Sequence, residues 1–149
     1  MDGIPEISGI TTRLRDAHSL PDTLAAGFEA FEAVRQLARG CEDAVPGLFA
    51  AFMTAADAAI DGRDAITIAP ALPPDRRGGA GVSMPQASVP VEEMADAMAG
   101  LSAVLTDRLS RAAAIAATGA DRAACTEAAQ AAGRICHLMA RDDHDRRPW

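Results

Sequence analysis

The chain has 149 residues, of which 49% are apolar and 23% are charged, and its formal net charge is -7. This mixture is typical of a compact globular protein, and we expect one helical domain over 1–149. Lys, Asn and Tyr are absent, and all 14 basic residues are Arg. The absence of Lys excludes a P-loop and an amine nucleophile, and the absence of Asn excludes N-glycosylation. The abundance of Ala, Arg, Gly and Pro indicates a bacterial genome of high GC content.

The net charge, the N-terminal sequence and the cysteines indicate the compartment and the partners of the protein. A net negative charge disfavours binding to polyanions, so nucleic acid is not an expected partner. The first residues, MDGIPEISG, lack the basic opening and apolar core of a secretory signal. No apolar run reaches the about 18 residues of a membrane span. Three cysteines, an odd number, indicate free thiols in a reducing compartment. We therefore expect a cytoplasmic protein without a membrane partner.

The first predicted helix covers 19–40, and no element is predicted before it. Ser19 can cap the free backbone N–H groups of a first turn, and Pro21 fits that turn. Gly40 is expected to end this helix. Apolar residues recur at spacings of three and four, as an amphipathic helix requires. These residues are Leu24, Phe28, Phe31, Val34 and Ala38.

A second helix is predicted over 43–61, and it should form an antiparallel hairpin with the first. Its apolar stripe comprises Val45, Leu48, Phe49, Phe52, Ala56 and Ile60. Gly62 is expected to end it. The stretch 62–89 is rich in Pro and Gly, and we expect it to form a long connector.

Two further helices are predicted over 90–118 and 121–140, followed by a charged tail over 141–149. Gly119 should end the first of them, and Asp121 can cap the second. The sequence therefore predicts an all-α fold. Its expected architecture is a four-helix bundle of two antiparallel hairpins joined by a long crossover loop.

The last predicted helix carries an apolar stripe of small side chains. Such a face stabilises mainly by close backbone approach, because Ala contributes little apolar area. This helix is expected either in a crowded interior or against a second copy of the chain, which would make the protein a homo-oligomer. The terminal Trp149 is either a frayed end or an anchor on a partner. The interface candidates are Cys125, Ala128, Ala132, Cys136, Met139 and Trp149.

A ligand pocket between the two hairpins is the alternative, although Phe at helical spacing is more often plain core. Its candidate lining residues are Phe28, Phe31, Phe49, Phe52, Arg134 and His137. No catalytic residue is assigned, because the adjacent side chains of Cys136 and His137 diverge by about 100° on a helix. Metal-ligand spacings such as Cys-x-x-Cys and Glu-x-x-His are absent, so no metal or other cofactor is expected.

These observations favour a non-enzymatic helical module that acts through protein contacts, as an adaptor, regulator, chaperone or assembly subunit. Its partner would be another protein or a second copy of itself. The alternative is a bundle that binds a small molecule, or a minor enzyme, with its pocket between the hairpins. A third reading is a secreted helical effector. No motif in the sequence identifies a family.

Overall fold

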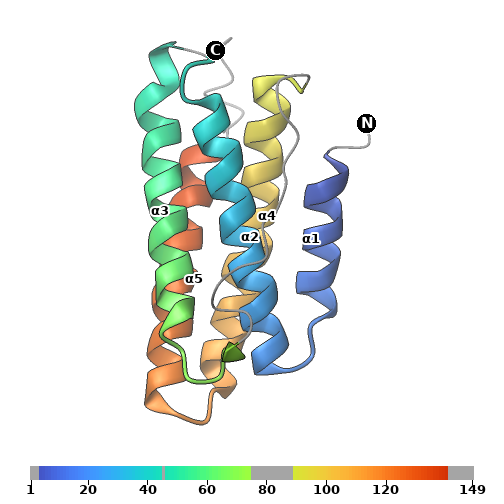
Figure 1. The fold of residues 1–149 in the computed structure, drawn as a ribbon, viewed down its shortest axis with the longest axis vertical. Helices are drawn as coiled ribbons and strands as arrows, with labels where there is room; N and C mark the ends of the chain where they lie inside the picture. The colour runs from blue at the N-terminus through green and yellow to red at the C-terminus, as the bar shows by residue number, and fades with distance from the viewer. Residues whose placement is uncertain (1–3, 45, 75–88, 141–149) are drawn as a thin grey trace.

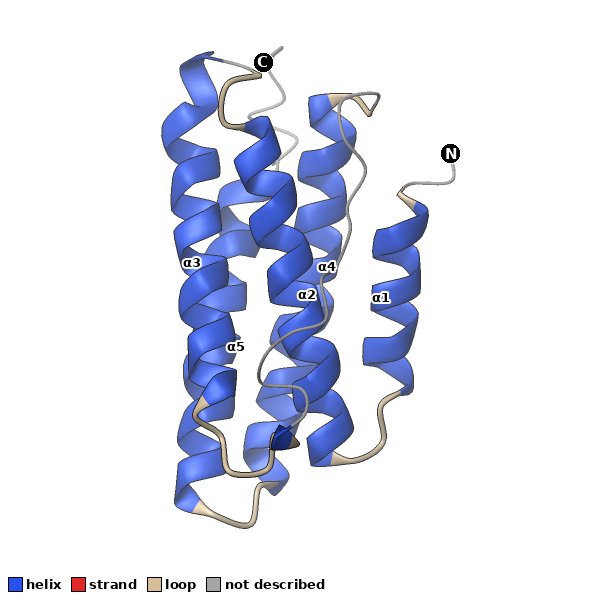
Figure 2. Cartoon of the chain, viewed as in Figure 1, coloured by secondary structure: helices blue, strands red, loops and turns tan. Residues whose placement is uncertain are grey.

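A computed structural model describes residues 4–44, 46–74 and 89–140, and these residues form helices and turns but no strand (Figures 1 and 2). The all-α prediction is confirmed. The predicted number of four helices is wrong, because the described residues form five α-helices. They are α1 (Pro5–Asp16), α2 (Leu20–Cys41), α3 (Phe49–Thr67), α4 (Val91–Ile115) and α5 (Gly119–Met139), with a short 3-10 helix, η1 (Pro46–Leu48), before α3.

The helices lie side by side along one long axis (Figure 1). α2 and α3 are antiparallel neighbours, as are α4 and α5, and further contacts join α3 to α5 and α2 to α4. α1 lies against α2 and α4. None of the helices in the described ranges is long and apolar enough to cross a membrane.

Several expected element bounds differ from those in the structure. The helix expected over 43–61 is divided into η1 and α3, and α3 continues to Thr67, inside the stretch 62–89 that was expected to be a connector. Gly62 does not end α3, because it lies at a close helix contact described below. α4 ends at Ile115 rather than at residue 118, and α5 covers Gly119–Met139 rather than 121–140.

The unpredicted helix α1 and the two residues that flank it contribute five side chains to the protein interior. They recur at spacings of three and four residues and are all buried: Ile4, Ile7, Ile10, Leu14 and Ala17. Two polar contacts hold the helix against its neighbours. Arg13 of α1 pairs with Glu29 of α2 at 2.8 Å, and Arg108 of α4 donates a hydrogen bond to the backbone carbonyl of Ala17. The apolar spacing is present in the sequence, so this helix could have been predicted from it.

Glycines allow α2 and α3 to approach closely. Gly62 of α3 faces the ring of Phe31, and a Cβ added at Gly62 would overlap that ring. One helical turn away from this contact, a Cβ at Gly27 would lie 3.0 Å from the Cδ1 of Ile66. Phe31 and Ile66 are both fully buried. Large side chains of each helix therefore fill space that a missing side chain leaves on the other.

The predicted cap of α2 is present, whereas that of α5 is different. Ser19 Oγ accepts a hydrogen bond from the backbone N–H of Asp22 at 3.2 Å. At α5 the capping residue is Thr118, whose Oγ1 accepts from the backbone N–H of Asp121 at 3.1 Å. The buried carboxylate of Asp121 instead accepts from the backbone N–H of Ala71 at 2.9 Å. Asp121 thereby joins the chain that follows α3 to the start of α5.

Replacing Gly62 with Ala tests the close contact of α2 with α3. We expect Gly62→Ala to lower the free energy of unfolding by about 1–3 kcal/mol, since the added methyl group would displace the Phe31 ring. Gly100→Ala is the matched control, because Gly100 lies on α4 with open space around its missing Cβ. The control should be stabilised by about 0.5–1 kcal/mol through its higher helix propensity. Urea denaturation measures both, and a Gly62→Ala variant as stable as the unmodified chain would contradict the contact.

An ion cluster joins α2 to α3 at their half-buried edge. Glu32 accepts hydrogen bonds from Arg35 and Arg63, and its carboxylate pairs with Arg35 at 3.1 Å and with Arg63 at 2.5 Å. Burial alone would raise the pKa of Glu32. The hydrogen bonds and positive charges of the two arginines outweigh that effect and lower this pKa below its ordinary value.

The lowered pKa of Glu32 predicts a dependence of stability on pH. Because the folded chain holds this carboxylate ionised more readily than the unfolded chain, its stabilising effect is complete above the unfolded pKa and is lost as pH falls through the folded pKa. We expect Glu32→Gln to be less stable at neutral pH and to lose less stability between about pH 5 and pH 3. Thermal denaturation at several pH values measures this. Asp96→Asn, an exposed carboxylate on α4, is the control; equal pH profiles for the two variants would contradict the role of Glu32.

Candidate functional site

One exposed surface of α3 combines large apolar side chains with carboxylates. At 100° per residue its members fall within an arc of about 120°. We call this set the α3 outer face. It comprises Phe49, Met53, Asp57, Asp61, Asp64 and Ile68, the residue that directly follows the helix.

The apolar members of the α3 outer face are exposed to an unusual degree for their size. Phe49 is 43% exposed and Met53 is 39% exposed, and the two lie one helical turn apart. At the other end of the helix Ile68 is 70% exposed. Single exposed apolar residues are common on protein surfaces, but neighbouring ones of this size are typical of contact sites.

The three aspartates of this face each have an arginine nearby. Asp57 lies 3.8 Å from Arg39 of α2, and Asp61 lies 3.5 Å from Arg134 of α5. Asp64 pairs with its neighbour Arg63 at 3.3 Å. All three aspartates are exposed, and such pairs contribute little to stability because water screens them. The carboxylates therefore remain available to a ligand or partner.

A groove lies between α3 and α5 and borders the α3 outer face. Its volume is about 440 Å³, compared with about 330 Å³ for a hollow between α1 and α4. Three carboxylates and one guanidinium line it. We call it the α3–α5 groove, lined by Asp61, Asp64, Ala65, Ile68, Glu127, Gln130 and Arg134. Within the described parts of the chain, no group of three or more His, Cys, Asp or Glu side chains is arranged to hold a metal ion.

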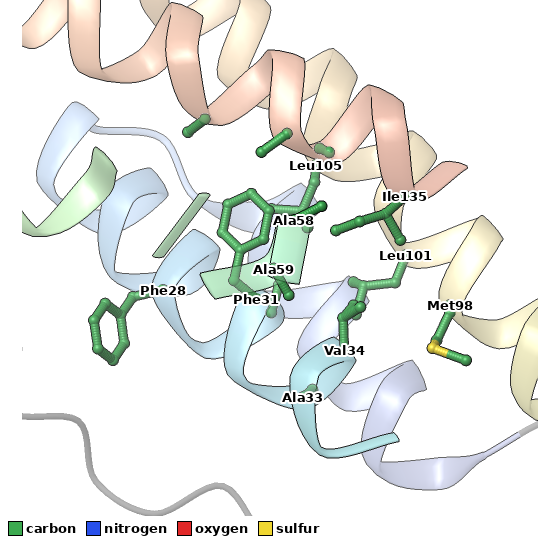
Figure 3. Close-up of a cluster of buried hydrophobic side chains, with 14 of the residues drawn as sticks. Phe28, Phe31, Ala33, Val34, Ala58, Ala59, Met98, Leu101, Leu105 and Ile135 are labelled. Carbon is green, nitrogen blue, oxygen red and sulfur yellow. The ribbon is translucent and has the colours of Figure 1, made fainter. Parts of the chain in front are cut away.

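The candidates for a ligand pocket do not gather at one place. Phe31 and Phe52 are fully buried and Phe28 is 8% exposed, whereas Phe49 lies at the surface. In Figure 3 the rings of Phe28 and Phe31 point to different sides of α2, and Phe31 lies among side chains from α3 and α4. Arg134 lines the α3–α5 groove. His137 is exposed one turn further along α5. Three of the four Phe residues are thus core residues.

Four of the interface candidates lie in the protein interior. Cys125, Ala128, Ala132 and Met139 are buried in the hydrophobic core beneath neighbouring helices of the same chain. Of the two expected settings for this stripe, the structure therefore has the crowded interior. Cys136 is partly exposed. Trp149 lies outside the described residues.

Two of the three cysteines are shielded from reaction by burial. Burial raises the pKa of the Cys125 thiol to about 11, and the negative charge of Asp121 adds to this shift. Burial also raises the pKa of Cys41, which lies 3.2 Å from the sulfur of Met94. Cys41 is the last residue of α2 and is buried in the protein interior. A thiol held protonated is a poor nucleophile.

Comparisons with known proteins do not assign this site. No family model matches the chain, and no significant match was found among curated proteins or solved structures.

Most of the α3 outer face was not predicted as functional. The pocket candidates from the sequence include Phe49 of this face and Arg134 of the adjoining groove, but not Met53, Ile68 or the aspartates. A signal was present, since Phe49 and Met53 are four residues apart and Met53 does not lie on the predicted buried stripe. Because the sequence pattern places Phe49 on the buried stripe of this helix, it does not predict an exposed pair of Phe49 and Met53.

Alkylation of the native protein tests the burial of its thiols. With iodoacetamide at about pH 8 we expect Cys136 to be modified well before Cys41 and Cys125, because it is partly exposed and the other two are buried with raised pKa values. Mass spectrometry of digested samples taken over time measures the three rates. In denaturant the three thiols should react at similar rates, which is the control. Rapid modification of Cys125 in the native protein would contradict its burial.

Proposed function

We propose that this protein is a non-enzymatic helical interaction module and that it binds a protein partner through the α3 outer face. The observation that carries this proposal is the exposed pair Phe49 and Met53, one turn apart on a helix whose opposite side is fully buried. Leaving two large apolar side chains in water is unfavourable, and contact with a partner would remove that cost.

The rest of this helix supports a role in binding. α3 is held firmly by its inner side, where Gly62 packs under Phe31 and Phe52 is fully buried. Side chains on a rigid helix can meet a partner without much loss of conformational freedom. Aromatic and methionine side chains are also enriched in protein interfaces. The outer face is therefore suited to recognition of another protein.

A small-molecule pocket between the hairpins has less support. The Phe residues that would line it are divided between the core and the surface. Phe31 occupies the space above Gly62, and Figure 3 shows side chains of α3 and α4 close to it, among them Ala58 and Leu105. We therefore place the functional surface on the outside of α3, while adaptor, regulator, chaperone and assembly roles all remain compatible with it.

The double variant Phe49→Ser/Met53→Ser tests the proposed function. A partner is first captured with the unmodified chain and identified, and its dissociation constant is then measured by calorimetry with purified components. We expect the double variant to weaken binding about 10-fold or more, since interface anchors of this type commonly contribute about 1–2 kcal/mol each. Circular dichroism should show an unchanged helical content, because both residues are exposed.

Ile115→Ser is the matched control for this measurement. Ile115 is 76% exposed and is the last residue of α4, outside the α3 outer face. It removes exposed apolar surface without altering the proposed contact, so the affinity should remain that of the unmodified chain. If the two variants have equal affinities for the partner, the α3 outer face is not its binding site.

A further inference from the structure

We infer that the partner segment is a basic amphipathic helix, with apolar side chains that contact Phe49 and Met53 and with Lys or Arg side chains that enter the α3–α5 groove. This inference rests on the proposed function and adds the chemistry of the partner to it. It is carried by the position of the apolar pair relative to the groove and by the charges that line the groove.

The apolar pair and the groove are aligned along one helix. Asp61 and Asp64 follow Met53 by 8 and 11 residues, which corresponds to about 12 and 17 Å along the helix axis. From Phe49 to Ile68 the α3 outer face extends over about 28 Å. A partner helix of about 20 residues has that length. One continuous helical segment can therefore contact the apolar pair and the groove at the same time.

The charges of the α3–α5 groove favour a cation. Asp61, Asp64 and Glu127 contribute three negative charges, and Arg134 contributes one positive charge. Glu127 has no ion pair among the residues that the structure describes, and it is exposed. A lysine or arginine of the partner could pair with it and with Asp64, while its aliphatic stem lies along the exposed Ile68. The groove thus offers both parts of a site for a long basic side chain.

A second copy of the chain fits this groove less well. Symmetric pairing through the α3 outer face would bring together two surfaces that both carry Asp57, Asp61 and Asp64, and each chain has a net charge of -7. Like charges in direct opposition disfavour association. We therefore assign the groove to a different, basic partner.

Binding of synthetic peptides to the full chain tests this inference. The probe is a fluorescent helical peptide of about 20 residues with two Leu residues one turn apart, followed two to three turns later by two Lys residues. Its matched control has Glu in place of both Lys. Fluorescence anisotropy should show that the Lys peptide binds at least about 10-fold more tightly at low salt, and that this advantage shrinks as salt screens the charges. Equal affinities for the two peptides would overturn the inference.

Charge variants locate the site of the basic side chains. Asp64→Asn/Glu127→Gln should weaken binding of the Lys peptide about three- to tenfold and reduce its dependence on salt. Glu92→Gln/Asp96→Asn removes the same charge from exposed positions on α4 and should change the affinity less than about twofold. Equal losses in the two double variants would show attraction by net charge alone and would overturn the assignment to the groove.

Two further outcomes separate this inference from the proposed function. In the first, Phe49→Ser/Met53→Ser abolishes binding of the captured partner, while Asp64→Asn/Glu127→Gln leaves its affinity unchanged. The α3 outer face then remains the binding site, but the inference that the partner is basic is wrong. Light scattering of the chain without peptide covers the second case. A dimer that dissociates in the Phe49→Ser/Met53→Ser variant would show that a second copy occupies this face, and it would overturn the basic partner.

Discussion

The close approach of α2 and α3 at Gly62 is the contact on which the remaining structure depends. Because Gly62 has no side chain, the ring of Phe31 can lie directly against α3, and the same pairing places Ile66 over Gly27. This contact fixes α3 with one side turned inward. It thereby decides which residues of α3 reach the surface, so the position of the outer face follows from a glycine on the inner side. Asp121 adds a second constraint, since it holds Ala71 to the start of α5 just after α3 ends.

Much of the helical fold could be predicted from local signals. The Ser19 cap, the apolar spacing in α2 and the stripe of α5 all indicate elements that the structure contains. The wrong end of the second predicted helix has a physical origin, which is that glycine has two roles in helices. Gly62 resembles a stop because Gly ends many helices, but here a neighbouring aromatic ring requires it inside one. α1 has a regular apolar spacing but no side-chain cap at Ile4, so it lacks one of the two signals that mark the start of α2.

The surface was harder to predict than the core, because exposure depends on how neighbouring helices meet. Phe49 continues the apolar spacing of Phe52 and Ala56, yet it lies in the first turn of α3 and is 43% exposed, whereas those two residues are fully buried. Arg134 and Asp61 are 73 positions apart in the chain, and only the packing of α3 on α5 brings them to one groove. A sequence pattern records the apolar spacing along one helix, but it does not record how two distant helices pack against each other.

The attachment of α1 has a consequence for the order in which the chain can fold. Its last turn is held by Arg108, a residue 91 positions after the carbonyl that it contacts. During synthesis α1 leaves the ribosome before the other described helices. α4, which is one of the two helices that α1 contacts, emerges only after α2 and α3 are complete. Until α4 emerges, α2 is the one of these two neighbours that α1 can contact. Although α1 is made before the other described helices, it thus gains its full set of helix contacts only after α4 is made.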